Sequence, residues 1–387
     1  KTIVAALSAL TAIESGAQSA VMAPTEILVE QHFIKFKQWL EPLGLEVVWL
    51  SGSQRKKAKD EAKAKLADGT VKIAVGTHAL FSDDVEFQNL GLVIVDEQHR
   101  FGVAQRLALK NKGRDVHQLM MSATPIPRTL AMSFFADLDV SVIDELPPGR
   151  TPIKTRLVNN VRRAEVEGFV LNICRKGQQA YWVCPLIEES ETLQLQTATE
   201  TLEQLQAALP ELNIGLVHGR MKAAEKAEVM AEFAAGRLNV LVATTVIEVG
   251  VDVPNAALMV IEHAERMGLA QLHQLRGRVG RGAAESVCVL LFAEPLSELA
   301  KARLKVIYEH TDGFEIARQD LNIRGPGEFL GARQSGVPML RFANLEEDLH
   351  LLEQAREIAP MLIEQNPEIV EAHLARWLSS REGYLGV

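Results

Sequence analysis

Short apolar runs alternate with longer amphipathic stretches along the first part of the chain. The stretch that follows Pro24, Thr25 and Glu26 and ends near Leu40 has the periodicity of a helix that packs by one face. Strands that are apolar on both faces and alternate with helices predict a parallel sheet covered on both sides. The expected strands are 19–23, 45–50, 71–75, 92–95 and 118–121. Polar motifs follow most of these runs, as expected for a site at the carboxyl ends of parallel strands.

The alternation pauses at the proline-rich segment 146–152 and then resumes. Proline cannot continue a helix or a central strand, so this segment is the best candidate for a linker. A helix is expected at 223–235, with Gly236 as its C-terminal cap. Further strands are expected at 179–185, 212–217, 240–243, 257–261 and 287–292. The pattern therefore predicts a second α/β lobe.

After Pro295 the pattern changes to helices at 296–310 and 346–359 and a helical tail through Trp377. The segment 322–336 is too rich in Gly and Pro to form one regular element. We therefore expect an α/β protein with two parallel-sheet lobes and a small helical C-terminal region. The expected domains are 1–147, 148–295 and 296–387.

Composition narrows the class of protein. Hydrophobic residues make up 47% of the chain and charged residues 24%, as in a globular protein. No apolar stretch reaches the ~18–20 residues of a membrane span, and the start lacks a signal-peptide cleavage pattern. Cys174, Cys184 and Cys288 form no C-x-x-C or zinc spacing, so buried reduced thiols of a cytosolic protein are expected.

The net charge of the chain is weak evidence for or against a nucleic-acid partner. The net charge of −9 disfavours a nucleic-acid partner, although phosphate binding depends on local patches. The basic cluster at 54–65 is as well explained by a solvated helix face as by a DNA contact. Aromatic residues make up only 5%, which favours contact with the phosphate backbone over base stacking.

Asp96 and Glu97 directly follow the apolar run 92–95. A carboxylate at the end of a buried strand can hold Mg²⁺, and its neighbour can orient and deprotonate an attacking water. The alternative is a solvated acidic turn. The full string V-I-V-D-E-Q-H, with S-A-T-P following at 122–125, favours the metal site.

Lys1 and Thr2 match the end of G-x-x-x-x-G-K-[ST], in which Lys neutralises phosphate charge and Thr ligates Mg²⁺. The glycines of that motif do not precede them here, so we expect this chain to bind nucleotide poorly. Arg278 and Arg281 lie three residues apart in a glycine-containing string and could stabilise charge on a transferring phosphoryl group. A flexible basic loop is the alternative.

Other polar positions follow expected strands. Ser122 and Thr124 would connect a nucleotide-binding cleft to the surface that binds nucleic acid. After other expected strands, hydroxyl groups, imidazoles and free backbone N–H groups could contact the phosphates of a nucleic acid. Turn and cap chemistry is the alternative for each. The additional candidates are Thr25, Thr77, His218, Thr244, Thr245, Glu248, Gly250 and Asp252. Isolated histidines such as His32 and His117 are interpreted as structural, with no assigned role.

Taken in order, the motifs resemble those of superfamily 2 helicases: K-T, A-P-T-E, G-T-H-A, D-E-Q-H, S-A-T-P, A-T-T-V-I-E-V-G-V-D and Q-L-R-G-R-V-G-R. The strings at 96–103, 122–130 and 320–331 narrow the resemblance to the RecG family of bacterial branched-DNA translocases. That resemblance implies two RecA-like lobes that use ATP and Mg²⁺ to move on duplex DNA and remodel stalled forks and Holliday junctions. It also implies a cytoplasmic bacterial monomer without membrane contact, which meets replication or repair proteins.

The resemblance also assigns residues. Nucleotide and Mg²⁺ contacts fall on Lys1, Thr2, Asp96, Glu97, Gly250, Asp252, Gln274, Arg278 and Arg281. Contacts to DNA, or the coupling of hydrolysis to DNA, fall on Thr25, Thr77, His99, Ser122, Thr124, His218 and Thr245. The region 303–334 resembles a coupling hairpin and loop shared with the Mfd family, in which Arg303, Arg324 and Gln334 are the expected network.

Two other interpretations stay open. An Mfd-like duplex translocase shares most of these motifs. The RecG resemblance implies a fork-splitting wedge domain that is not in this sequence, which bears on fork specificity. Because the glycines of the phosphate-binding motif are missing as well, the chain alone could instead be a catalytically inactive DNA-binding or interaction module.

Overall fold

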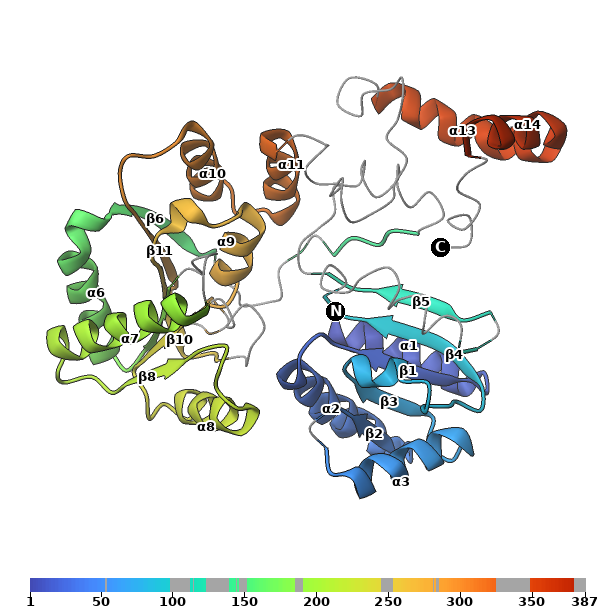
Figure 1. Cartoon of the computed structure of the whole chain (residues 1–387), viewed down its shortest axis with the longest axis horizontal. Coiled ribbons are helices and arrows are strands. Elements are labelled where there is room, and N and C mark those ends of the chain that lie inside the picture. Colours follow the sequence, from blue (N-terminus) through green and yellow to red (C-terminus); the bar gives the residue numbers. More distant parts are fainter. Residues whose placement is uncertain are drawn as a thin grey trace. The chain divides into compact units, whose positions relative to one another are not determined.

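The computed structural model describes residues 1–52, 54–97, 112–113, 115–122, 139–143, 145, 152–184, 191–244, 253–280, 282, 285–324 and 349–378. Internal contacts divide the chain into two compact units, each of which is described by itself. The first comprises Lys1–Thr124 and Glu145–Ile316, and the second Pro125–Asp144 and Ala317–Val387. The first unit contains two separate β-sheets (Figure 1).

The first sheet has five parallel strands in the order β2-β3-β1-β4-β5. They are β1 (Gln18–Met22), β2 (Val47–Leu50), β3 (Ile73–Gly76), β4 (Leu90–Val95) and β5 (His117–Met120). Side chains alternate between two buried clusters: Ala20 and Met22 of β1 join one, and Val21 joins the other. Both faces are therefore buried, as the apolar runs predicted.

Helices cover each face of this sheet. The cluster containing Val21 also receives side chains from α1 (Thr2–Glu14) and α2 (Glu26–Leu40), whereas α3 (Lys56–Ala67) packs into the other cluster. Thr25 caps α2, because its Oγ1 accepts a hydrogen bond from the Leu28 N–H at 3.4 Å. The buried positions of α2 are Val29, His32, Phe36 and Leu40, which is the spacing of one helix face.

The second sheet has six parallel strands in the order β6-β11-β10-β7-β9-β8. They are β6 (Lys154–Asn159), β7 (Gln179–Val183), β8 (Ile214–Val217), β9 (Val240–Ala243), β10 (Ala256–Ile261) and β11 (Val287–Phe292). Strand β6 was not predicted. It lies at the sheet edge and mixes polar with apolar residues, so it lacks the continuous apolar run of the central strands.

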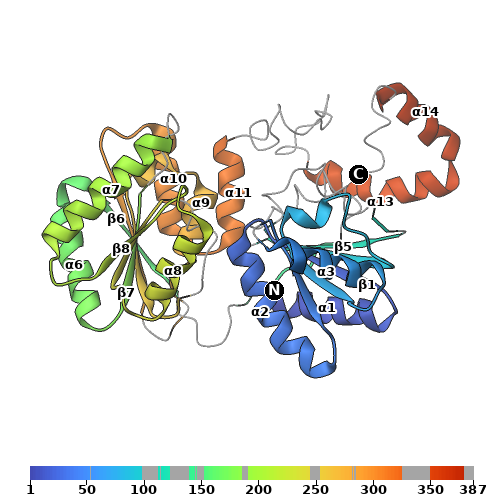
Figure 2. The same cartoon turned by 60° about the horizontal axis from the view of Figure 1, so that its bottom comes forward.

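Helices again lie on both faces of the second sheet (Figure 2). One face carries α6 (Arg163–Arg175) and α7 (Glu191–Ala208), whose apolar residues share a cluster with Trp182. On the other face, the ring of Phe233 in α8 (Ala223–Ala234) lies 4.9 Å from that of Tyr181. Helix α8 ends as predicted, because Gly236 takes φ +76° and donates its N–H to the Phe233 carbonyl.

The C-terminal part is helical, as predicted. After α9 (Leu269–Arg276) and α10 (Glu298–Glu309) come α11 (Gly313–Arg324), α13 (Leu349–Gln365) and α14 (Pro367–Leu378). The Gly- and Pro-rich segment begins inside α11, and its residues 325–336 lie outside the described residues.

The predicted fold class is thus confirmed: two parallel-sheet lobes followed by helices. The three domain boundaries stay a prediction, since most of the linker 146–152 lies outside the described residues. All three cysteines are free and buried, as expected. Every helix in the described ranges is too short or too polar to cross a bilayer.

Candidate functional site

The polar motifs of the first lobe lie in a row along one edge of its sheet. Each motif begins within two residues of the end of a strand, and backbone hydrogen bonds extend the parallel pairing one residue beyond each strand. These bonds join Thr77 N to Leu50 O (3.2 Å), Ala23 N to Gly76 O (3.1 Å), Asp96 N to Met22 O (2.9 Å) and Met121 N to Val95 O (2.8 Å). The carboxyl edge therefore brings A-P-T-E, G-T-H-A, D-E and the start of S-A-T-P together.

Asp96 is held on both carboxylate oxygens. Oδ2 lies 2.8 Å from His32 Nε2, and Oδ1 accepts the backbone N–H of Glu97 at 3.0 Å. Burial acts to raise the pKa of Asp96, but the hydrogen bond and charge of His32, the charge of Lys1 and the Glu97 N–H together lower it below its usual value. Asp96 is therefore ionised at neutral pH, and hydrogen bonds hold both of its carboxylate oxygens.

Glu97 has a left-handed backbone, with φ at +51°. This conformation is uncommon for a residue other than Gly, Asn, Asp or His and costs free energy, which is typically tolerated where a functional turn requires it.

Lys1 faces the same carboxylates. Its Nζ donates to the Ser122 carbonyl oxygen at 2.6 Å, so the residue before α1 reaches the segment after β5. Burial of the ammonium group lowers the pKa of Lys1, and the charges of Glu97 and Asp96 act in the opposite direction. Thr2 begins α1 and is half-buried. The structure thus brings together Lys1, Asp96, Glu97 and the backbone of Ser122.

The donor chemistry fits a Mg²⁺ ion that arrives with phosphates. Mg²⁺ typically takes one or two carboxylates, with the remaining positions filled by substrate phosphates and water. Asp96 supplies one such charged oxygen ligand. The described residues contain no group of three or more His, Cys, Asp and Glu side chains that could form an all-protein metal site.

The threonines predicted to contact phosphate also serve the backbone. Thr25 caps α2, and Thr77 Oγ1 accepts the Ala79 N–H at 3.5 Å at the start of η2 (His78–Phe81). Each hydroxyl keeps its own O–H to donate. Thr77 is buried, whereas Thr25 is half-buried and lies nearer the surface.

In the second lobe, too, polar residues follow the strands at the carboxyl edge of the sheet. The ladder extends through Thr244 N to Val217 O (3.2 Å), Cys184 N to Ala243 O (2.8 Å) and Glu262 N to Val183 O (2.9 Å). His218 follows β8 at this edge. Burial, then the charges of Lys226 and Arg220, lowers the pKa of His218. A neutral imidazole is therefore favoured there at physiological pH.

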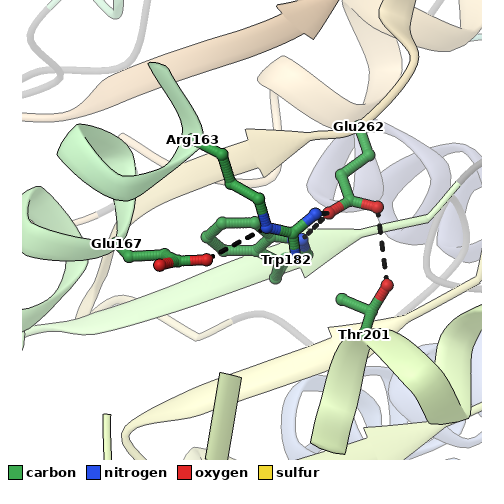
Figure 3. A network of polar contacts seen from close by, with 5 residues as sticks. All are labelled: Arg163, Glu167, Trp182, Thr201 and Glu262. Carbon is green, nitrogen blue, oxygen red and sulfur yellow. Dashed lines mark hydrogen bonds and ion pairs between the residues drawn. The ribbon is translucent and has the colours of Figure 1, made fainter. Parts of the chain in front are cut away.

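Glu262 anchors a buried network that the sequence did not reveal (Figure 3). Its Oε1 accepts from Arg163 Nη1 and, at 2.9 Å, from Trp182 Nε1, while Thr201 Oγ1 lies 3.5 Å from Oε2. The Arg163 guanidinium also lies 5.1 Å from the centroid of the Trp182 ring and donates to Glu167 at 3.0 Å. Glu262 follows an apolar strand, as Asp96 does, and that placement was the available signal.

The arginines of the motif Q-L-R-G-R-V-G-R differ in their surroundings at the end of α9. Arg276 closes the helix and is 2% exposed, whereas Arg278 lies beyond the helix and is half-buried. Nη1 of Arg276 donates to the carbonyl oxygens of Ile307 and His310, each at 2.8 Å. Gly280 takes φ +78°, and a Cβ there would lie 2.8 Å from Ile153 Cγ1, so this position requires glycine.

Arg303 in α10 donates from Nη1 to the Met267 carbonyl oxygen at 3.1 Å, just before α9. Gln274 lies within α9 and Arg324 is the last residue of α11. The other predicted site residues lie outside the described residues: His99, Thr124, Thr245, Glu248, Gly250, Asp252, Arg281 and Gln334.

The basic cluster lies largely on α3, with part of its charge paired. Lys63 forms an ion pair with Asp84, and Lys65 lies 2.7 Å from Glu46. Lys56 and Lys57 are exposed.

Comparison with known proteins gives a consistent result across the chain. Residues 1–133 match the DEAD/DEAH box helicase model and residues 166–283 the helicase conserved C-terminal domain. Residues 310–378 match the model for ATP-dependent DNA helicase RecG, domain 3, C-terminal.

Individual relatives are similar over nearly the full chain. The ATP-dependent DNA helicases RecG of Acidithiobacillus ferridurans and Escherichia coli (strain K12) are 58% and 57% identical over 99% of the chain. The chain spans 56% of the length of each. A solved structure of RecG bound to a three-way DNA junction superposes with a TM-score of 0.71 at 47% identity, covering 91% of this chain and 46% of that one.

Proposed function

Because the chain belongs to the RecG family of ATP-dependent DNA helicases, we propose that it is the motor of an ATP-driven translocase that remodels branched DNA. The observation that carries this proposal is the juxtaposition of Lys1, Asp96 and Glu97 at the carboxyl edge of the first sheet. A cation and two carboxylates in one place are the groups that nucleotide hydrolysis requires.

Bound MgATP would supply the phosphoryl group whose transfer to water drives the motor. The Lys1 ammonium would neutralise phosphate charge, and Asp96 with the Thr2 hydroxyl would hold Mg²⁺. Glu97 would orient the attacking water and accept its proton. The anchored, charged state of Asp96 supports its part in this assignment.

The second lobe would supply the arginines. Arg278 and Arg281 would stabilise the charge that develops on the phosphoryl group, with Gln274, Gly250 and Asp252 as further nucleotide contacts. Arg276 is buried, whereas Arg278 lies nearer the surface. This difference supports assigning the phosphoryl contact to Arg278 and not to Arg276.

Duplex or branched DNA is the proposed partner, contacted through its phosphates. Hydroxyl and imidazole groups at the carboxyl edges suit such contacts, which position the protein without reading sequence. The proposed contacts are Thr25, Thr77 and His218, with His99, Ser122, Thr124 and Thr245 linking them to hydrolysis. Arg303, Arg324 and Gln334 would couple lobe movement to translocation. A monomeric state and contacts with replication or repair proteins stay predictions.

The substitution Glu97→Gln tests the proposed chemistry. We expect it to keep nucleotide binding and to abolish hydrolysis in the intact protein, because the amide cannot accept the proton. Binding of a fluorescent ATP analogue and phosphate release measure the two separately. Glu165→Gln, on the exposed surface of the second lobe, is the control and should hydrolyse ATP normally. Unchanged hydrolysis in Glu97→Gln would remove Glu97 as the base.

The DNA partner is tested by stimulation of hydrolysis. Three-way-junction DNA and linear duplex are compared at equal phosphate concentration and salt, because the electrostatic part of binding depends on both. Stronger stimulation by the junction supports the branched-DNA proposal. Equal stimulation would indicate a general duplex translocase.

A further inference from the structure

We propose that His32 is a positioning residue for the metal ligand Asp96, so that helix α2 contributes to the Mg²⁺ site. This inference rests on the proposed function, which makes Asp96 a ligand. His32 lies in the middle of α2, and Asp96 directly follows β4. The fold brings the two side chains together across 64 positions of sequence, with Nε2 and Oδ2 2.8 Å apart.

The chemistry of the pair defines the donor. A carboxylate oxygen accepts hydrogen bonds, so in this 2.8 Å contact Nε2 of His32 carries the proton and donates to Oδ2 of Asp96. Among the described residues, Nδ1 of His32 is buried without a hydrogen-bond partner. The bond to Asp96 is therefore the polar interaction that the structure shows for this ring.

The surroundings hold the ring in place. His32 is 5% exposed, and its ring meets that of Phe36 edge-on with centroids 6.2 Å apart. A buried ring with this packing has few alternative rotamers, so the direction of its N–H is set by the fold. A mobile surface histidine could not supply such a fixed donor.

The consequence for Asp96 is loss of rotational freedom. One oxygen accepts from His32 and the other from the Glu97 N–H at 3.0 Å, which fixes the carboxylate plane before any metal arrives. The remaining lone pairs stay available for a cation, since a carboxylate offers about four acceptor positions. Hydrogen bonds to a ligating carboxylate typically change metal affinity by about 10–100-fold.

The test measures metal binding directly. Mn²⁺ replaces Mg²⁺ in oxygen-ligand sites and is followed by electron paramagnetic resonance in the presence of ADP. In the intact protein, we expect His32→Leu to weaken Mn²⁺ binding to the protein–ADP complex by roughly 10–100-fold, with ADP binding in the absence of metal unchanged. His32→Gln, which keeps an N–H donor of similar reach, should recover most of the affinity.

Two controls separate positioning from packing. Leu40→Ala loosens the same helix two turns from His32, without touching the His32 ring or Asp96, and should bind Mn²⁺ as the wild type does. In an Asp96→Asn background, His32→Leu should cause no further loss, because the two residues act through one ligand. Circular dichroism confirms that each variant is folded.

The outcomes are distinguishable. Wild-type Mn²⁺ affinity in folded His32→Leu, or an equal loss in Leu40→Ala, would overturn the role of His32 and leave Asp96 as a ligand. Wild-type affinity in Asp96→Asn would overturn the metal assignment in the proposed function, and the role of His32 with it.

Discussion

Arg276 caps the helix that ends beside His310: its Nη1 donates to the His310 carbonyl oxygen at 2.8 Å. The same guanidinium reaches the carbonyl oxygens of Ile307 at 2.8 Å and Thr311 at 3.3 Å. The last carbonyls of a helix lack partners within it, so one buried arginine here satisfies several of them. Burial also lowers the pKa of Arg276 below its ordinary value.

Removing that guanidinium should destabilise the second lobe. Arg276→Leu leaves the buried carbonyl of Ile307 and the part-buried carbonyls of His310 and Thr311 without this donor, which we expect to cost roughly 2–4 kcal/mol. Urea unfolding followed by circular dichroism measures the change. Arg162→Leu, which removes an exposed arginine paired with Glu165, is the matched control and should shift the transition little. Equal shifts would show that the Arg276 bonds contribute nothing specific.

The Arg163–Glu262 pair should show strong coupling. Glu262→Leu leaves the Trp182 N–H without its acceptor and leaves Arg163 with Glu167 as its remaining carboxylate partner, so we expect a loss of roughly 1–3 kcal/mol. The double variant Arg163→Met, Glu262→Leu removes both charges and should be less destabilised than the sum of the single variants. A double-mutant cycle in urea gives the coupling energy. Simple additivity would contradict the network.

Gly76 should tolerate no side chain. A Cβ there would lie 2.4 Å from the Leu50 carbonyl oxygen and 2.8 Å from Leu80 Cγ, so β2 or η2 must move. We expect Gly76→Ala to cost roughly 1–3 kcal/mol. Gly168→Ala in α6 is the control, because its Cβ would meet nothing within 4 Å and should stabilise the helix by about 0.5–1 kcal/mol. Thermal unfolding of the two variants should therefore move in opposite directions.

The cysteines should be unreactive in the folded protein. Burial raises the pKa of Cys174 to about 11 and those of Cys184 and Cys288 to about 12. Because only the thiolate reacts, a raised pKa keeps reactivity low between about pH 7 and 9, where a free thiol would ionise. Ellman's reagent should label the native protein slowly and all three thiols after denaturation. Rapid labelling of the native chain at neutral pH would contradict this burial.

The strands that the sequence predicted well are those with a continuous apolar run, including the edge strand β5, expected at 118–121 and found at His117–Met120. The bounds of β9 and β11 match the prediction, because both faces of a central strand must be apolar and the run is continuous. The edge strand β6 was missed because its exposed positions carry Lys and Arg. Helices α6 and α7 were not placed, although the second sheet required helices on its faces.

For the candidate site, too, some positions followed from the sequence and others depended on packing. The position of Asp96 and Glu97 at the carboxyl edge of the first sheet could be predicted, because residues that end parallel strands share one edge. His32 was interpreted as structural, and its contact with Asp96 could not be predicted because it depends on how α2 packs beside β4. The sequence assigned Arg276 no role of its own within the motif Q-L-R-G-R-V-G-R. Its burial against α10 distinguishes it from Arg278.

The sequence by itself determined the alternation of strand and helix, the two-lobed α/β class and the order of the polar motifs, because these follow from local hydrophobic periodicity and chain order. The tertiary structure alone decided which side chains meet. His32 contacts Asp96, Arg163 contacts Glu262, and Arg276 contacts the end of α10. Each of these contacts joins elements far apart along the chain, and their partners are set by packing geometry that local sequence does not encode.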